Sequence, residues 1–449
     1  MVFGTTILGS NPSAPARKMN KISFNNNLIK KIKNFFFPFY KTEEISKIFD
    51  ILYKNHSQDE KIAMFVGGCV RNFILDEKID DIDIATVFTP TEIKEKFKNT
   101  DIKVIDTGVE HGSVTLILNQ SKFEITTLRK DIKTDGRHAE ISFTDNWKDD
   151  SERRDFTINA IYLDRKGNFF DPQLGVEDLK NNTVKFIGDP SKRIEEDYLR
   201  IIRFIRFALK YSHKNFEPST IQALKLNLSG IKNISKERIL QELIKIISLK
   251  NFRDILNKKE LKDIFSQIFP EFKNLIRLNK VTFLPKEEFE KLNTNMLLAL
   301  MLIDEKNNHE YFCHKYKVSN QIQDYLDNLH KNLKEYKISK NYFKTDLKKN
   351  IYFIGKNEIK DLAILIFFIN KNLNYRDLKK LIDDIEKTTI PKFPYDGKFL
   401  IDKGFSEGKK IGLILKKLEK NWVENNYKLT EKDISSIIEK ESKSNVFNA

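Results

Sequence analysis

The sequence predicts an α+β protein in which a small domain with a mixed sheet is followed by an all-helical remainder of roughly twice its length. Segments that alternate apolar and polar side chains, as strands do, are concentrated before about residue 170. Beyond that point apolar residues recur at helical spacing, and prolines separate the segments. A chain of 449 residues has room for about two to four domains.

The first domain contains several short segments with clear patterns. Residues 62–68 form an apolar run that ends in glycines, which predicts a strand followed by a tight turn. Alternation predicts further strands at 81–86, 113–118 and 122–128. Apolar residues at helical spacing predict helices at 44–56 and 70–77.

The remainder of the chain is dominated by helical periodicity. The expected helices span residues 193–211, 219–227, 235–248, 259–267, 286–303, 318–335, 358–369, 374–386 and 408–421. No repeat of fixed period is visible in this part of the sequence.

The composition favours a polyanionic partner. Lys and Arg outnumber Asp and Glu by 79 to 64, which gives a net charge of +15. A chain rich in Lys, Asn, Ile and Phe could also reflect AT-rich codons, so the charge alone does not identify nucleic acid. The two cysteines form no disulfide framework and lie in no metal-ligand spacing, which fits a reducing compartment such as the cytoplasm. No apolar run reaches the roughly 18 residues of a membrane helix.

Residues 1–18 differ from the rest of the sequence. They are rich in Gly, Ser, Pro, Ala and Thr, whereas Lys, Asn and Ile dominate from Met19 onward. They lack the charged and then apolar pattern of a signal peptide. We therefore expect a disordered extension or a misplaced start codon, with translation beginning at Met19.

Five residues in the first domain have the pattern of a phosphate and metal site. Gly67 and Gly68 follow a predicted strand, so the backbone there can approach a ligand closely, and Arg71 follows within reach of the same anion. Asp81 and Asp83 are two residues apart on a predicted strand and therefore project from one face. Two such carboxylates repel unless a cation neutralises them, and Mg²⁺ prefers carboxylate and phosphate oxygens. The alternative is an exposed acidic strand.

Two further segments contribute candidate residues. Glu124 lies on a later predicted strand and could bind metal or accept the proton of an attacking hydroxyl, although it could equally be a surface residue. Arg153 and Arg154 precede an apolar segment, and guanidinium groups suit phosphate oxygens. Because adjacent side chains on a regular element cannot both point inward, we expect one arginine to bind ligand and the other to be structural.

The segment 193–208 is predicted to be one continuous helix with a polar stripe. Asp197, Arg200, Arg203 and Arg206 recur every three residues among isoleucines and phenylalanines. A solvated helix face also carries spaced charges. So many arginines within an apolar stretch favour a binding role instead.

These segments together resemble class II CCA-adding enzymes, the tRNA nucleotidyltransferases of the polymerase-β-like superfamily. The resemblance runs from about residue 62 to 250, and a weaker similarity to bacterial members covers 404–424. The motifs occur in order as GGCVR, DIDIAT, GVEHGSV, TTLRKD, DGRHAEISF, RRDFTINA, DP–G–EDL, EEDYLRIIRFIRF and SKERILQEL.

The resemblance implies template-independent addition of CCA to the 3′ end of tRNA from CTP and ATP, with Mg²⁺ bound by Asp81 and Asp83. Glu124 matches a third carboxylate less securely. The nucleotide contacts that the resemblance implies are Gly67, Gly68, Arg71, Arg154, Asp197, Arg200, Arg203 and Arg206. It also implies a catalytic head at 62–170 after a helical segment at 19–61, a helical neck at 171–250, and an elongated body and tail at 251–449 that bind tRNA.

In the family the pair matched by Asp197 and Arg200 reads the base. Cytosine and adenine present an amine donor beside a ring-nitrogen acceptor, which a carboxylate beside a guanidinium complements. Uracil and guanine present the reverse order and would leave both protein groups unpaired. The protein itself could thus select C and A without a nucleic-acid template.

Three alternatives stay open from the sequence. A bacterial poly(A) polymerase shares the catalytic motifs but typically has a basic, aromatic-containing segment where this chain has GVEHGSV at 108–114. An enzyme that adds only CC lacks a flexible loop, which residues 131–140 are expected to supply here. A non-catalytic RNA-binding protein would not need Asp81 and Asp83.

Overall fold

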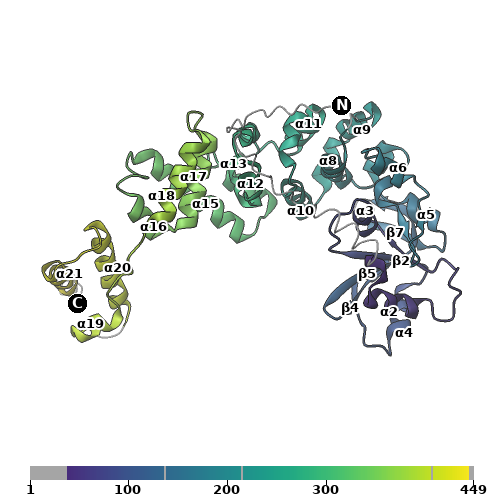
Figure 1. Cartoon of the computed structure of the whole chain (residues 1–449), viewed down its shortest axis with the longest axis horizontal. Coiled ribbons are helices and arrows are strands. Elements are labelled where there is room, and N and C mark those ends of the chain that lie inside the picture. Colours follow the sequence, from purple (N-terminus) through teal and green to yellow (C-terminus); the bar gives the residue numbers. More distant parts are fainter. Residues whose placement is uncertain (1–37, 136–137, 214–215, 406–407, 444–449) are drawn as a thin grey trace, which may run out of the picture. The chain divides into compact units, whose positions relative to one another are not determined.

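The computed structural model describes residues 38–135, 138–213, 216–405 and 408–443. The chain divides into two compact units, Met1–Asp189 and Pro190–Ala449. Figure 1 shows strands in the first unit and helices in the second. The expected extension 1–18 lies outside the described residues. The predicted boundary at 170 falls within the first unit, so the expected domain limits stay predictions.

A seven-stranded mixed sheet forms the centre of the first unit, in the order β3-β4-β5-β2-β1-β8-β9. Strand β2 pairs in parallel with β5, whereas the other neighbours in this sheet are antiparallel. The strands are β1 (Ala63–Val66), β2 (Ile82–Thr86), β3 (Lys103–Gly108), β4 (Ser113–Leu118), β5 (Ser121–Thr127), β8 (Tyr162–Leu163) and β9 (Phe169–Phe170). The predicted mixed sheet is confirmed.

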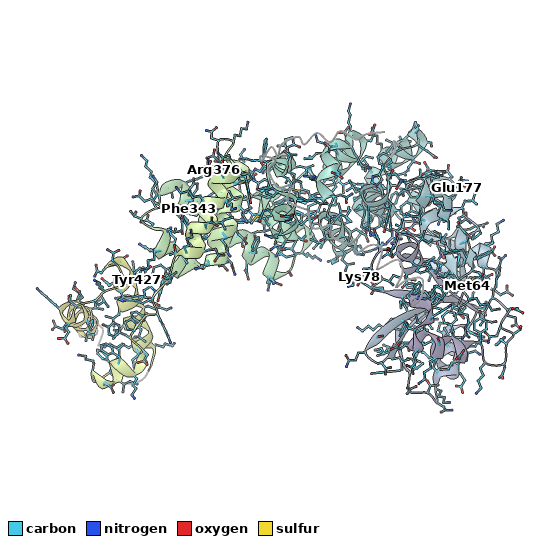
Figure 2. All side chains as sticks on the ribbon, viewed as in Figure 1. Met64, Lys78, Glu177, Phe343, Arg376 and Tyr427 are labelled. Atoms are coloured by element: carbon cyan, nitrogen blue, oxygen red, sulfur yellow. The ribbon has the colours of Figure 1, made fainter. Side chains whose placement is uncertain are left out.

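Short helices complete the first unit. They are η1 (Phe39–Lys41), α2 (Glu43–Leu52), α3 (Gly68–Ile74), α4 (Pro90–Phe97), η2 (Val109–His111), α5 (Trp147–Glu152), η3 (Thr157–Asn159) and α6 (Gly175–Lys180). Met64 on β1, labelled in Figure 2, is 2% exposed and packs in a core cluster with Trp147 and Tyr162. Apolar side chains alternating along β4 and β5 explain why their buried faces meet this core.

The expected flexible loop at 131–140 is mostly strand. Strands β6 (Arg129–Asp135) and β7 (His138–Phe143) form a separate two-stranded antiparallel sheet. Asp135 pairs with His138, so the connection is residues 136–137, which lie outside the described part. An Asp-Gly pair at 135–136 is a hairpin signal, and this signal predicts two strands rather than a loop.

Helix α6 is fixed onto η3 through a tight backbone approach. Asp171 accepts hydrogen bonds from the backbone nitrogens of Gly175 and Val176, each at 2.8 Å. It thereby satisfies two N–H groups that have no partner within the helix. Thr157 donates a hydrogen bond to Asp178 at 2.7 Å. A Cβ at Gly175 would lie 2.2 Å from the carbonyl oxygen of Thr157, so only glycine fits there.

Among the described residues of the second unit, the regular elements are all helices. They are α7 (Pro190–Glu196), α8 (Leu199–Tyr211), α9 (Pro218–Leu226), η4 (Leu228–Asn233), α10 (Lys236–Ile247), η5 (Phe252–Asn257), α11 (Lys259–Ile268), η6 (Leu275–Phe283), α12 (Lys286–Glu290), α13 (Thr294–Leu302), α14 (Asn308–Tyr316), α15 (Asn320–Ile338), α16 (Leu347–Ile354), α17 (Lys356–Ile369), α18 (Tyr375–Lys387), α19 (Gly397–Asp402), α20 (Lys409–Glu424) and α21 (Glu431–Lys443). Among the described residues, no helix is both long and apolar enough to cross a membrane.

Two expected helices are each divided in the structure. The helix expected at 193–211 is interrupted at Asp197, whose carboxylate accepts a hydrogen bond from the Leu199 nitrogen at 3.1 Å and starts α8. The helix expected at 286–303 is interrupted before Asn293, which caps α13 by accepting a hydrogen bond from Met296 at 2.8 Å. Both interruptions follow from a short polar side chain that competes for backbone N–H groups.

Replacing Gly175 with alanine should lower the free energy of unfolding by about 1–3 kcal/mol, because the added Cβ would overlap a backbone oxygen that cannot easily move. Gly412 is the matched control. It lies within α20, and apart from its chain neighbours and the backbone of its own helix no described atom lies within 4 Å of the position that its Cβ would take, so Gly412→Ala should instead stabilise by up to about 1 kcal/mol. Urea unfolding of both variants measures this, and equal effects of the same sign would contradict the packing described for α6.

Candidate active site

Strand pairing brings two of the three predicted carboxylates together. Asp83 on β2 and Glu124 on β5 are direct partners in the parallel register, so their side chains leave the same face of the sheet. Asp81 precedes β2 by one residue and is exposed, as is Glu124, whereas Asp83 is partly buried. The structure thus places a half-buried carboxylate between two exposed ones.

This environment disfavours the charged form of Asp83. Burial raises the pKa of its carboxyl to about 6, and the negative charges of Glu124 and Asp81 add to the rise. Arg154 and Arg71 act in the opposite direction without cancelling it. Because the ionised form of Asp83 is destabilised in this environment, a ligand that supplies positive charge would stabilise it.

The donor set fits a hard divalent cation. Carboxylate oxygens are the ligands that Mg²⁺ prefers, and no described residue donates a hydrogen bond to the Asp83 side chain. Among the described residues, the oxygens of Asp81, Asp83 and Glu124 do not all come within 4.8 Å of one another.

The glycine turn lies directly beside Asp83. Gly67 has φ 75° and ψ −128°, a backbone conformation that residues other than glycine rarely adopt. A Cβ at Gly67 would lie 3.6 Å from Oδ2 of Asp83, and one at Gly68 would lie 3.8 Å from Nη2 of Arg71. The backbone at the start of α3 therefore borders both the carboxylate and the guanidinium.

Arg71 is held by residues that the sequence did not single out. Its side chain is 8% exposed and donates a hydrogen bond to Oδ1 of Asn159. Asn159 in turn donates to Oδ1 of Asp155 at 2.8 Å, which also accepts from the Phe156 nitrogen at 2.9 Å. Asp155 and Asn159 both belong to RRDFTINA, so the signal was present, but its polar members were not interpreted as supports for Arg71.

Arg153 and Arg154 converge on one carboxylate, so the premise that adjacent side chains must diverge does not hold here, whereas the expectation that one of them binds ligand stays a prediction. Both bind Asp150, which is fully buried, at 2.7 and 3.0 Å, and Tyr162 donates to the same carboxylate at 2.7 Å. Burial alone would raise the pKa of Asp150, but the two guanidinium groups hold it well below its usual range. Both arginines lie beyond the end of the short helix α5, where irregular backbone lets neighbouring side chains converge.

In the second unit, Asp197 and Arg200 have separate partners. Asp197 binds Arg238 of α10 at 2.7 Å. Arg200 binds Glu196 and donates to the carbonyl oxygen of Arg193 at 2.6 Å. The expected continuous stripe is interrupted between α7 and α8, so these two residues are positioned by different contacts. Arg238, within SKERILQEL, is a contact that the sequence analysis did not assign.

Arg203 and Arg206 both lie beside Glu242 of α10. The distances to its carboxylate are 3.8 Å from Arg203 and 2.7 Å from Arg206, and Lys245 approaches to 3.1 Å. Glu242 is 3% exposed. Burial opposes its ionisation, but the arginines lower its pKa overall, so it stays charged. The arginines thus fasten α8 to α10 in addition to any contact with a ligand.

Asp83→Asn should stabilise the metal-free protein at pH 8. The folded-state pKa of about 6 lies above the ordinary value of 3.8, so the fold loses stability as the pH rises from about 3.8 to about 6, and the full cost of ionised Asp83 is present above that range. Removing the charge should recover on the order of 1–3 kcal/mol at pH 8 and little at pH 4. Thermal unfolding in the presence of a chelator measures this difference.

Asp80→Asn is the control for this experiment. Asp80 precedes the same strand but is exposed and pairs with Lys78, labelled in Figure 2, at 2.5 Å. Its replacement should change stability by less than about 1 kcal/mol at either pH. A metal-free Asp83→Asn protein that is less stable than the wild type at pH 8 would contradict the proposed cost of the buried charge.

Two family models match the chain. The Poly A polymerase head domain matches residues 63–185, and the probable RNA and SrmB-binding site of polymerase A matches residues 215–276. The first covers the strands that hold Asp83 and Glu124. The second covers α10, which holds Arg238 and Glu242.

Curated relatives match over most of both chains. Mitochondrial CCA tRNA nucleotidyltransferase 1 of Danio rerio is 31% identical over 427 residues, covering 89% of this chain and 93% of its own length. The human protein of the same name is 32% identical and covers 89% and 90%. The CCA-adding enzyme of Streptococcus uberis is 32% identical and covers 84% and 93%.

Solved structures share the fold. The Bacillus stearothermophilus CCA-adding enzyme in complex with CTP superposes with a TM-score of 0.66 at 22% identity, over 90% of this chain and 99% of that one. The Thermotoga maritima enzyme complexed with tRNA gives a TM-score of 0.58 at 22% identity, over 89% and 96%. With relatives more than 30% identical along nearly their full length, this chain belongs to the family of CCA-adding tRNA nucleotidyltransferases.

Proposed function

We propose that this chain adds and repairs the 3′-terminal CCA of tRNA, using CTP and ATP and releasing pyrophosphate. The observation that carries the proposal is the in-register pair of Asp83 and Glu124, with Asp81 and the Gly67 turn beside it. Relatives named as CCA-adding enzymes along nearly the whole chain support the choice of reaction. The two buried free thiols, Cys69 and Cys313, are compatible with a reducing compartment, and we propose the cytoplasm.

The head residues have complementary proposed roles. Asp81 and Asp83 would hold Mg²⁺, the ion that the carboxylate oxygens fit, and Glu124 would bind metal or accept the proton of the RNA 3′-hydroxyl. When bound, Mg²⁺ supplies positive charge to the triphosphate and to the attacking oxygen. Gly67, Gly68 and Arg71 would contact the triphosphate, with Arg71 held ready by Asn159. In-line attack of the hydroxyl on the α-phosphorus then displaces pyrophosphate.

Arg154 is proposed to bind the nucleotide from a fixed position. Its guanidinium already binds Asp150 and contacts the Tyr162 hydroxyl at 3.2 Å, so it loses little side-chain entropy on binding a ligand. Its positive charge lowers the pKa of Asp83, which indicates that it lies near the carboxylates. A fixed cation of this kind stabilises charge without having to move during the reaction.

Base selection is proposed for Asp197 and Arg200. Each oxygen of Asp197 has one protein partner, Leu199 or Arg238, and can accept a further hydrogen bond from the amine of cytosine or adenine. Arg200 would donate to the ring nitrogen, with Arg203 and Arg206 as further nucleotide contacts. Uracil or guanine would make neither of these additional hydrogen bonds, and each missing bond to a charged group would cost about 1–3 kcal/mol.

The helical remainder is the proposed tRNA-binding part. We propose a neck at 171–250 that holds the nucleotide and RNA end, and a body and tail at 251–449 that grip tRNA, after a catalytic head at 62–170. The net charge of +15 favours contacts to phosphate, and A-form RNA exposes little sequence for a protein to read. We therefore expect recognition of the tRNA by shape.

A terminal-addition assay tests the reaction. Purified protein is incubated with tRNA that ends at the discriminator base, or with generic RNA, and with CTP, ATP or both. We expect addition of three nucleotides to tRNA when both are present and of two when only CTP is present. Long A tails on any RNA would instead indicate a poly(A) polymerase, and addition that stops at CC with both nucleotides would indicate a CC-adding enzyme.

Asp81→Ala should lower the rate in this assay by at least about 100-fold, because a metal ligand contributes several kcal/mol of charge stabilisation in the transition state. Asp80→Ala is the matched control, since this neighbouring carboxylate pairs with Lys78 and should leave the rate within about twofold. Full activity of Asp81→Ala would contradict the assignment of the metal site, and absence of activity in both variants would point to a folding defect that circular dichroism would reveal.

Arg238→Ala should weaken the choice of base. Without Arg238, Asp197 loses the partner that fixes Oδ2, so kcat/KM for CTP and ATP should fall by about tenfold while incorporation of UTP changes less. Single-nucleotide incorporation rates measure this ratio. Lys232→Ala, an exposed residue of η4, is the control and should not alter it. An unchanged ratio of CTP to UTP in Arg238→Ala would contradict a positioning role for Arg238.

A further inference from the structure

A cluster of metal-ligating side chains lies in the second unit and shares no residue with the candidate active site. His309 and Glu310 come from α14, and His330 comes from α15, which packs against α14. One nitrogen of each histidine and one oxygen of Glu310 all lie within 4.8 Å of one another. The two imidazole rings meet edge to face with centroids 4.4 Å apart.

Both histidines are buried with nitrogens that lack partners. His309 is 1% exposed and His330 is 5% exposed. Neither ring nitrogen of His309 nor Nε2 of His330 has a hydrogen-bond partner among the described residues. Buried polar atoms of proteins are nearly always hydrogen-bonded, so several orphaned nitrogens in one place point to a missing ligand.

The surroundings favour the form of histidine that binds metal. A buried imidazole is disfavoured as a cation, and only the neutral ring offers a lone pair. Nε2 of His330 is buried without a hydrogen-bond partner among the described residues, so its lone pair is available to a metal ion.

Asp327 supplies a second acidic group at the cluster. Its Oδ1 lies 3.2 Å from Nε2 of His309 but is not aligned for a hydrogen bond, and it also has no partner among the described residues. Glu310 is exposed and lies on the solvent side of the buried rings. The other charged groups that act on His309 are Asp304 and Lys334, so carboxylates predominate.

We propose that His309, Glu310 and His330 bind one transition-metal ion of the zinc class, which would fasten α14 to α15. Two imidazole nitrogens with a carboxylate suit Zn²⁺, whereas Mg²⁺ prefers oxygen ligands alone. Asp327 would orient His309 or complete the coordination. The site is separate in residues and in ligand chemistry from the carboxylates proposed for catalysis.

Equilibrium dialysis of the full-length, chelator-treated protein against Zn²⁺ tests the proposal, with bound metal counted by mass spectrometry. We expect His309→Gln and His330→Gln each to bind one Zn²⁺ per chain fewer than the wild type. Zn²⁺ should also raise the unfolding midpoint of the wild type by at least about 2 °C and that of the variants by less, because a ligand that binds only the folded state stabilises it.

Two further variants separate binding from folding. Glu310→Gln changes an exposed residue, so it should leave the metal-free midpoint unchanged and weaken Zn²⁺ binding by at least about tenfold. His314→Gln changes an exposed histidine on the same helix and should bind as the wild type does. Equal Zn²⁺ stoichiometry and affinity in wild type, His309→Gln and Glu310→Gln would overturn the proposal, as would a wild type whose midpoint Zn²⁺ does not raise.

Discussion

The parallel pairing of β2 with β5 is the constraint on which the candidate site depends. It sets Asp83 against Glu124, and the close approach of Gly67 confines Asp83 to a half-buried position. Burial and neighbouring acids raise the pKa of Asp83 to about 6, so holding this charge lowers the stability of the fold. A divalent ion bound there, as we propose, would offset that cost.

Buried carboxylates position the basic residues of both units. Asp150 holds Arg153 and Arg154 in the first unit, and Glu242 holds Arg203 and Arg206 in the second. A buried ion pair contributes little net stability, because desolvation offsets much of the attraction. Its value here is geometric, since it holds long and flexible guanidinium side chains in defined positions.

The sequence predicted the elements whose patterns are local. Alternation in DIDIAT predicted β2, and helical spacing predicted α10, α17 and α18 closely. It could not predict contacts between distant segments, such as Asp150 with Arg154 or Asp197 with Arg238, because these depend on packing. The division of α7 from α8 was missed because the Asp197 side chain overrides the apparent helical periodicity. The β6–β7 hairpin was missed because its Asp-Gly turn signal was interpreted as a loop.

The most direct test of this account is anomalous diffraction from crystals of the full-length protein soaked with Mn²⁺ and CTP. Manganese is chemically close to magnesium in its preference for oxygen ligands and can be located by its anomalous scattering. The account predicts a manganese peak within coordinating distance of carboxylate oxygens from both Asp81 and Asp83, next to the Gly67 turn. Bound CTP with no manganese at these two carboxylates would contradict it.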